Sequence, residues 1–428
     1  MGTLEGDVMD SDWETFKAQL PGDWRELARV MGLIHPSLPQ LGAKITDIEQ
    51  VLRLELPRAG LEISLETTTA TAMAARAMLE ERGVATAAPS VPVDISAPAL
   101  HYWERKLAPY LAVLVARMTN AGAAFAASQW AGYVLVVVDG TTVTRPGADG
   151  TTARVVYAMR LAEMTIVKTV VTDKHGGESM RAFEPKPGEL WIGDRGYSNP
   201  PDIAWVVDAH ADVLVRLNRG ALPLYGAKGK RFDVMRQVQR LAKPEAMAEW
   251  PVWVRPEKHD PIPGRLCAVR LPEEEAEKAR QRLRREYGSA VSSEMLEAAA
   301  WVMVFTTVSR ERLSTEKILW AYRLRWQMEL EIKRDKSIGG MDKLPNFRDD
   351  TIATWLQCKL LIQQVARKIV SPAVAFPPGA ALGAALDAVL RGARDVAPPR
   401  ALHRRRDVAR HGPRPPSDPR RTVPHRAA

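Results

Sequence analysis

A stripe of mixed chemistry runs through residues 321–337, which read AYRLRWQMELEIKRDKS. Tyr322, Arg325, Glu329 and Lys336 supply a phenol, a guanidinium, a carboxylate and an ammonium group. At about 100° per residue, a helix brings all four within roughly 60° of one another. The stripe is either a solvated charged face or, because apolar residues fill the rest of the circumference, a packed face that needs a metal ion or phosphate as partner.

One helix, residues 314–337, is predicted to carry this stripe. Ser314 can cap its N-terminus, and Glu316 stands in the first turn. Gly339 ends the helix, and Lys336 lies in its last turn.

Two aspartates follow predicted buried strands. Asp139 comes after the β-branched run 133–138, and Asp194 comes after residues 189–192. Sheets of α/β proteins carry functional groups at the carboxyl ends of their strands, although a single aspartate there is often only a turn residue. Together with Glu329 they would form a cluster of three carboxylates. Such a cluster suits Mg²⁺, which prefers oxygen ligands. Two Mg²⁺ ions held close together can promote phosphodiester cleavage.

The elements that must position these residues follow an α/β pattern. Buried-type strands are predicted at residues 133–138, 154–161, 164–172, 189–192, 213–217 and 301–308, with helices at 178–183 and 202–209. Residues 220–300 interrupt this alternation of strands and helices. They contain strand candidates at 250–255 and 265–271 and helix candidates at 273–287 and 293–299. A further helix is predicted at 349–370.

The N-terminal part, residues 1–120, reads as helical. Helix candidates separated by Pro and Gly breaks, including Pro57 and Gly60, lie at 13–20, 24–31, 45–55, 65–82 and 97–119. The two helices within 45–82 are equally compatible with a DNA-reading helix-turn-helix and with an ordinary helical bundle.

Charge is unevenly distributed over the 428 residues. The chain has a formal net charge of +9, and nine arginines with two aspartates give residues 400–428 a charge of +7, which leaves +2 for the rest. Nucleic-acid binding by the body would therefore need local clusters of positive charge. We expect the Pro/Arg-rich end to be disordered. It is either a nucleic-acid-binding arm or, as we favour, the frame-shifted end of a GC-rich gene.

Several classes of protein are disfavoured by the sequence. Cys267 and Cys358 show no C-x-x-C pairing, and the eight histidines have no ligand spacing, which argues against zinc and disulfide frameworks. No phosphate-binding G-x-x-x-x-G-K-[ST] loop is present, so a nucleotide cofactor is not expected. The longest apolar stretch, residues 121–138, is poor as a membrane span, and no signal peptide is visible. Reduced cytosolic thiols are the expectation.

The spacing of residues 322–336 resembles the Y-(2)-R-(3)-E-(6)-K signature of bacterial insertion-sequence DDE transposases of the insertion sequence 4 family. Residues 139–141 (DGT) are similar to the first aspartate motif of that family, and residues 193–197 (GDRGY) to the second. The three motifs occur in the family's order. The resemblance covers roughly residues 95–370.

This resemblance implies a fold and a division of the chain. The fold would be α/β, a ribonuclease-H-like core with a β-rich insertion, preceded by an all-helical N-terminal region. The implied parts are a helical DNA-binding region 1–120, the first part of the catalytic core 121–219, the β-rich insertion 220–300, the last core strand and catalytic helix 301–345, a C-terminal helical region 346–397 and a disordered tail 398–428.

The resemblance also implies roles for single residues. The implied catalytic and metal-binding triad is Asp139, Asp194 and Glu329. The implied DNA contacts are Tyr322, Arg325, Lys336 and Trp301. Trp301 would stack on a flipped base, as in relatives that cut through a DNA hairpin, although a core tryptophan is at least as good an explanation.

The implied activity is a DNA transposase dependent on Mg²⁺, with Mn²⁺ as a substitute. It would bind terminal inverted repeats of double-stranded DNA, hydrolyse phosphodiester bonds at the ends and join the ends to target DNA by transesterification. We expect a DNA-bound homodimer in the bacterial cytoplasm, associated with the nucleoid. The alternatives are a stand-alone metal-dependent nuclease and an inactive DNA-binding remnant of an insertion element.

Overall fold

The computed structural model describes residues 13–33, 47–60, 97–119, 130–162, 165–337, 339–344 and 351–370. All of them belong to one compact unit, Met1–Ala375. A second unit, Phe376–Ala428, lies outside the described residues, and so does the predicted tail. No helix in the described part of the chain is long and apolar enough to cross a membrane.

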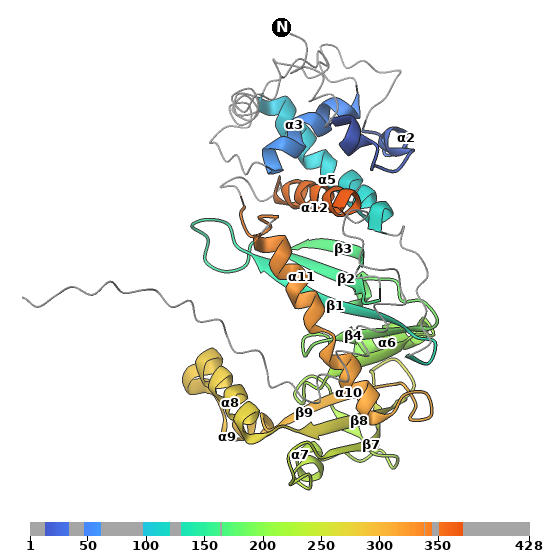
Figure 1. The fold of residues 1–428 in the computed structure, drawn as a ribbon, viewed down its shortest axis with the longest axis vertical. Coiled ribbons are helices and arrows are strands. Elements are labelled where there is room, and N and C mark those ends of the chain that lie inside the picture. The colour runs from blue at the N-terminus through green and yellow to red at the C-terminus, as the bar shows by residue number, and fades with distance from the viewer. Residues whose placement is uncertain are drawn as a thin grey trace, which may run out of the picture. The chain divides into compact units, whose positions relative to one another are not determined.

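A nine-stranded mixed sheet is the centre of the described unit (Figure 1). Its strand order is β3-β2-β1-β4-β5-β9-β8-β7-β6. The strands are β1 Val134–Val143, β2 Ala153–Arg160, β3 Thr165–Asp173, β4 Glu189–Gly193, β5 Asp212–Arg216, β6 Leu224–Tyr225, β7 Met247–Val254, β8 Ile262–Arg270 and β9 Trp301–Thr306. Strands β1, β4 and β5 run parallel, and every other neighbouring pair is antiparallel.

Side chains of β1 alternate between two hydrophobic clusters, one on each face of the sheet. Leu135 and Val137 belong to the cluster that also contains residues of the helices α5, α10, α11 and α12. Val136 and Val138 belong to the cluster that contains residues of α6. Because successive strand residues point to opposite faces, a strand covered on both faces needs an unbroken apolar run. The prediction of a doubly buried strand here is confirmed.

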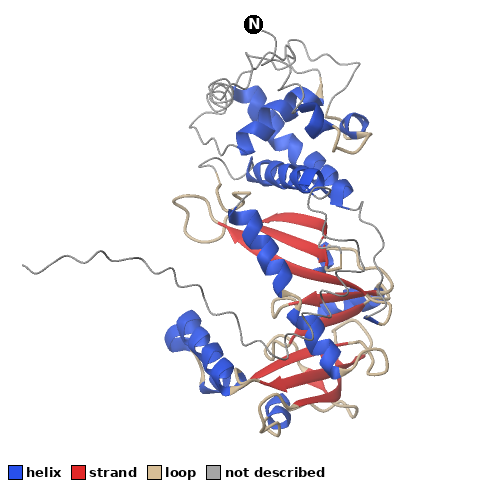
Figure 2. Cartoon of the chain, in the orientation of Figure 1, coloured by secondary structure: helices blue, strands red, loops and turns tan. Residues whose placement is uncertain are grey.

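Helices surround the sheet, as the secondary-structure colouring of Figure 2 shows. They are α2 Trp24–Val30, α3 Ile48–Gly60, α5 Ala97–Thr119, α6 Pro200–Asp208, α7 Val234–Val238, α8 Glu273–Tyr287, α9 Ser293–Ala298, α10 Thr315–Arg323, α11 Trp326–Ser337 and α12 Ile352–Val370. Helix α12 packs on α5, α3 and β3, and α5 also packs on β3. The N-terminal helices are thereby attached to the edge of the sheet that β3 forms.

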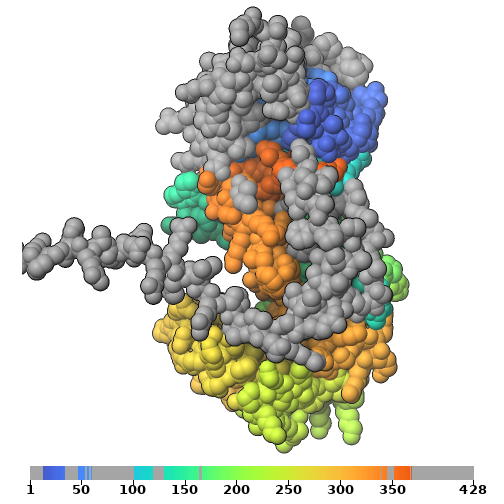
Figure 3. Space-filling model, viewed as in Figure 1, coloured from blue at the N-terminus to red at the C-terminus, as the bar shows by residue number. Residues whose placement is uncertain are grey.

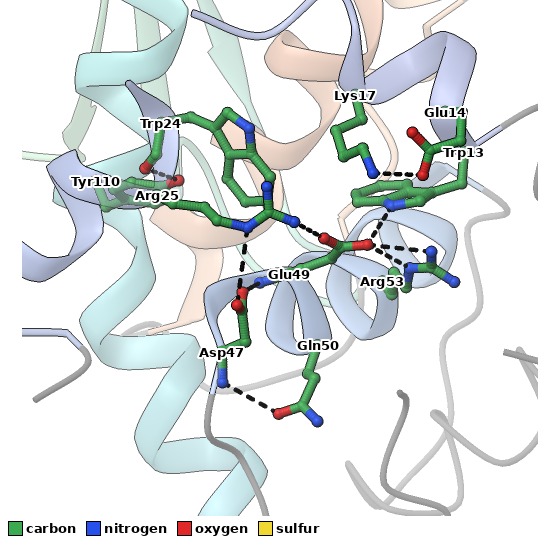
Figure 4. A network of polar contacts seen from close by, with 10 residues as sticks. All are labelled: Trp13, Glu14, Lys17, Trp24, Arg25, Asp47, Glu49, Gln50, Arg53 and Tyr110. Atoms are coloured by element: carbon green, nitrogen blue, oxygen red, sulfur yellow. Dashed lines mark hydrogen bonds and ion pairs between the residues drawn. The ribbon is translucent and has the colours of Figure 1, made fainter. Parts of the chain in front are cut away.

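Glu49 of α3 joins the N-terminal helices through a network of polar contacts (Figure 4). Its carboxylate accepts hydrogen bonds from Trp13 Nε1 at 2.6 Å and from Arg53 Nε at 3.2 Å, and it also pairs with Arg25 of α2. Burial alone would raise the pKa of Glu49, but the Trp13 hydrogen bond and the charges of Arg25, Lys17 and Arg53 hold it below its ordinary value. The carboxylate is therefore stabilised in its ionised form.

The predicted single helix over residues 314–337 is wrong. The chain forms α10 and α11, separated at Leu324 and Arg325. Several backbone hydrogen bonds there span only three residues, among them Arg325 N to Tyr322 O at 3.1 Å, Gln327 N to Leu324 O at 3.0 Å and Met328 N to Arg325 O at 3.0 Å. Such bonds tighten the turn and interrupt the α-helical ladder. The predicted Ser314 cap is confirmed, because its side chain accepts from Lys317 N at 3.3 Å.

Two further predictions need correction. The helix predicted at 178–183 is only the 3-10 turn Met180–Ala182. The Asp202 carboxylate accepts hydrogen bonds from Ser179 Oγ at 2.6 Å and Met180 N at 3.1 Å, and these bonds compete with a helix. Helix α3 does not stop at Pro57 but ends at Gly60. The predicted helix 65–82, the second helix of the possible helix-turn-helix, lies outside the described residues.

Candidate active site

Asp139 and Asp194 are brought side by side by the parallel pairing of β1 and β4. The register pairs Val137 with Ile192, and each aspartate stands two residues farther along its strand direction. Asp194 directly follows β4, as predicted. Asp139 does not follow its strand but lies within it, because β1 continues to Val143 in pairing with β2 after its pairing with β4 has ended. This correction leaves both carboxylates at the same edge of the β1–β4 pair.

Alternation along the strands directs both aspartates to the face that α11 covers. Val137 and Ile192 belong to the same hydrophobic cluster as Met328 and Ile332 of α11. Residues two positions apart in a strand point to the same face. Helix α11 also contacts β1 directly, and Figure 1 shows it crossing this part of the sheet.

Arg325 links the sheet to this helix. Its guanidinium donates to Asp139 Oδ2 at 2.9 Å, and it also pairs with Glu329. The side chains of Asp139 and Arg325 are largely buried, whereas Glu329 is 45% exposed. Orange atoms of the segment that contains α11 reach the surface on the face viewed in Figure 3. The planar guanidinium, which can serve two carboxylates at once, therefore holds together two of the predicted triad residues.

The Asp139 carboxyl group has a strongly shifted pKa. Burial raises the pKa of Asp139 to about 6, in the same direction as the negative charges of Asp194 and Glu178. Arg325 and a hydrogen bond from Gly140 N, 2.9 Å from Asp139 Oδ1, act in the opposite direction. Several carboxylates thus share a confined space, an arrangement typical of catalytic sites.

Glu178 is a member of this group that the sequence analysis missed. A Cβ atom added to Gly140 would lie 2.7 Å from Glu178 Oε1, and one added to Gly196 would lie 3.2 Å from Glu178 Oε2. The carboxylate therefore lies between the glycines of the two aspartate motifs. Burial raises the pKa of Glu178, as does the charge of Asp194, and Arg154 opposes them. The one sequence signal was an acidic residue after the pair Gly176-Gly177 in a strand connection.

Arg325 and Lys336, two of the predicted phosphate-binding residues, both lie close to β1. Lys336 is half-buried, and its Nζ donates to the Thr142 carbonyl of β1 at 3.4 Å. Tyr322 is 7% exposed, with the Arg325 guanidinium 6.0 Å from the centre of its ring. Although the helix is broken, Arg325 and Lys336 both reach β1.

Trp301 lies apart from these residues. Its side chain is 4% exposed and belongs to the cluster on the other face of the sheet, with the Arg270 guanidinium 5.3 Å from the ring centre. A ring buried in this way cannot receive a flipped base without leaving the core. The structure therefore favours the core explanation of Trp301.

The site matches a divalent cation in the chemistry of its donor atoms. Its donors are carboxylate oxygens, which match the preference of Mg²⁺. Across the described ranges, however, no three His, Cys, Asp or Glu side chains are grouped so that they could hold an ion. Positive charge between Asp139 and Glu329 is instead supplied by Arg325. The residues fit the cation in donor chemistry, while their present arrangement pairs them with arginine.

The chain is similar to known transposases of insertion sequences. Residues 130–361 match the family model of the transposase DDE domain. The InsL protein of insertion sequence element IS186A, from Escherichia coli (strain K12), is 30% identical over 285 residues, which is 65% of this chain and 76% of that protein. The transposase for insertion sequence element IS421 of Escherichia coli has the same identity over the same shares.

Proposed function

Because this chain belongs to the transposase DDE domain family, we propose that it moves an insertion sequence of the insertion sequence 4 family. It binds the terminal inverted repeats of that element, cleaves the DNA at those ends and joins them to target DNA. The observation that carries the proposal is the side-by-side position of Asp139 and Asp194 on the face that α11 covers, where Arg325 ties Glu329 to Asp139.

Three carboxylates carry the chemistry in this proposal. Asp139, Asp194 and Glu329 hold a divalent cation, Mg²⁺ or Mn²⁺, through oxygen ligands. When bound, such ions make water a better nucleophile and neutralise the charge that develops on a scissile phosphate. The protein fixes Asp139 by burial and by the Gly140 N–H bond, so this ligand needs little reorganisation.

The cationic residues bind the DNA backbone. Arg325 offers a planar fork that suits a phosphate as well as it suits a carboxylate, and Lys336 offers a point charge. Tyr322 lies beside Arg325, with 6.0 Å between the guanidinium and the centre of the ring. These residues with Glu329 are the Tyr-Arg-Glu-Lys signature of the proposed family. The partner is double-stranded DNA, on which the protein acts as a homodimer in the bacterial cytoplasm, without a nucleotide cofactor.

The proposal is tested with DNA that flanks the gene, which carries the element's own ends. Asp139→Asn, Asp194→Asn and Glu329→Gln should each lower the cleavage rate in Mg²⁺ by more than the roughly 10–100-fold that loss of an outer-shell partner costs. Gel-shift binding of the ends should persist, because the phosphate contacts remain. Glu184→Gln, at a side chain 84% exposed on the neighbouring connection, is the control.

The same assay separates the alternatives. The wild-type protein should give both cleaved ends and products joined to a target plasmid. Cleavage without end specificity or joining would identify a nuclease, and specific binding without cleavage would identify an inactive remnant. A triad variant that cleaves at the wild-type rate would remove that residue from the site.

A further inference from the structure

Glu178 connects the two aspartate motifs through space. Its Oε1 faces Gly140, next to Asp139, and its Oε2 faces Gly196, whose added Cβ would also lie 3.1 Å from Asp194 Oδ1. Neither glycine could carry a side chain without displacing this carboxylate. The backbone N–H groups of both glycines are bonded to the aspartates, Gly140 N to Asp139 at 2.9 Å and Gly196 N to Asp194 at 2.7 Å. Glu178 therefore packs against these two segments without receiving their N–H donors.

The chain on both sides of Glu178 is hydrogen-bonded to other elements. On one side, Ser179 and Met180 are hydrogen-bonded to the fully buried Asp202 at the start of α6. On the other, Arg154 of β2 donates to the Gly176 carbonyl at 2.7 Å. These bonds hold the segment that carries Glu178, while its side chain packs against Gly140 and Gly196.

A salt bridge with Arg154 is the competing explanation for Glu178. Arg154 Nε lies 3.7 Å from Glu178 Oε1, which is longer than a hydrogen bond. Ion pairs of this kind, with partly exposed partners, contribute little to stability. The pair therefore offers only weak compensation for placing a third carboxylate beside Asp139 and Asp194.

We propose that Glu178 is a further ligand of the divalent cation that Asp139 and Asp194 bind, either directly or through a bound water. This inference rests on the proposed function, because it assumes that the cation binds at these aspartates. A cation with oxygen ligands from three chain segments would offset the mutual repulsion of the carboxylates. Glu178 would then act in the site from the β3–β4 connection, outside the three aspartate and glutamate motifs.

The test measures Mn²⁺ binding to the full chain without DNA, by isothermal titration and by electron paramagnetic resonance. Glu178→Gln should weaken Mn²⁺ binding by roughly 10-fold or more. Its melting temperature without metal should be unchanged or higher, because the substitution removes a negative charge from the cluster. Glu184→Gln is the matched control, since that exposed carboxylate pairs only with Lys168 at 3.3 Å among the contacts described.

Each outcome has a distinct meaning. Wild-type Mn²⁺ affinity in Glu178→Gln, with weakened affinity in Asp139→Asn, would overturn the role of Glu178 and leave the proposed function intact. Wild-type affinity in both variants would count against the proposed function itself. Arg154→Gln removes the ion pair and keeps Glu178, so it should retain Mn²⁺ binding. If it weakened binding as much as Glu178→Gln does, Glu178 would be a structural partner of Arg154 and the inference would fail.

Discussion

At Arg325, one side chain serves two carboxylates from different elements. It bonds to Asp139 on β1 and to Glu329 on α11, and both of these acidic residues belong to the proposed metal-binding triad. A DNA phosphate would compete for the same guanidinium. If Arg325 binds phosphate as proposed, its position would couple phosphate binding to the freedom of the two carboxylates.

Replacing Arg325 tests its contact with DNA. Arg325→Ala and Lys336→Ala should each weaken binding of the cleaved end and lower the slope of log affinity against log salt by about one unit. Filter binding across a salt series measures the slope. Arg323→Ala is the control, because Arg323 is exposed and stacks on Trp320. Unchanged slopes would show that Arg325 and Lys336 do not contact DNA phosphates and belong only to a solvated charged face.

Gly140 offers a test of the site that does not depend on activity. A Cβ there would lie 2.7 Å from Glu178 Oε1, so Gly140→Ala should shift Glu178 and lower the free energy of unfolding by about 1–3 kcal/mol. Gly177→Ala, a position with no atom within 4 Å of the added Cβ, should change it by less than about 0.5 kcal/mol. Denaturant unfolding compares them, and equal stabilities would refute the close packing of Glu178 on Gly140.

At the scale of elements, the junction between α10 and α11 decides the geometry of the stripe. Tyr322 belongs to α10, Glu329 and Lys336 belong to α11, and Arg325 lies in the break. The backbone hydrogen bonds at the junction, which span three residues instead of four, place Arg325 where it can reach Asp139. Arg325 and Lys336 therefore reach β1 across a bend in the chain rather than from one straight helix.

The network around Glu49 yields an element-scale prediction of pH dependence. Because the folded pKa of Glu49 is lowered from 4.5, its contribution to stability is fully present above pH 4.5 and is lost as the pH falls through the folded value. Glu49→Gln should lower the free energy of unfolding at pH 7 by about 1 kcal/mol, and the difference should shrink below pH 4.5.

The control for Glu49 is Glu26→Gln on α2, where the exposed carboxylate pairs with Arg29 one turn away. Such a surface pair contributes little to stability, because solvent screens both charges. Denaturant unfolding between pH 3 and pH 7 gives both curves. A Glu49→Gln deficit that is constant across this range would show that the ionised carboxylate does not hold the helices together.

At the scale of the whole molecule, the net positive charge is concentrated at the C-terminal end of the sequence rather than spread along the chain. Residues 400–428 carry +7 of the net +9, and they lie outside the described residues. Truncation after Pro399 should reduce non-specific DNA binding at low salt and leave end recognition and cleavage intact, because those arginines add only salt-sensitive, sequence-independent affinity. Gel shifts and cleavage assays on both forms decide the matter. Loss of end-specific complexes at moderate salt would make the tail a functional arm.

The sequence by itself determined every described strand except the two-residue β6, most helices and the family resemblance, because these depend on local patterns. The β-branched runs marked β1 and β9, and Ser314 marked the start of α10. The sequence also placed Asp194 directly after its strand, because β4 ends where its apolar run ends.

Only the tertiary structure decided how these parts meet. No Pro or Gly marks the break before Arg325, which the local backbone bonds make and which brings its side chain to a carboxylate 186 residues away. Asp139 lies inside β1 because a separate strand, β2, continues to pair with it. Glu178 joins the aspartates through packing on two distant glycines, and Trp301 is buried by a core built from many segments. Such contacts depend on residues far apart in the chain, and no spacing along the sequence encodes them.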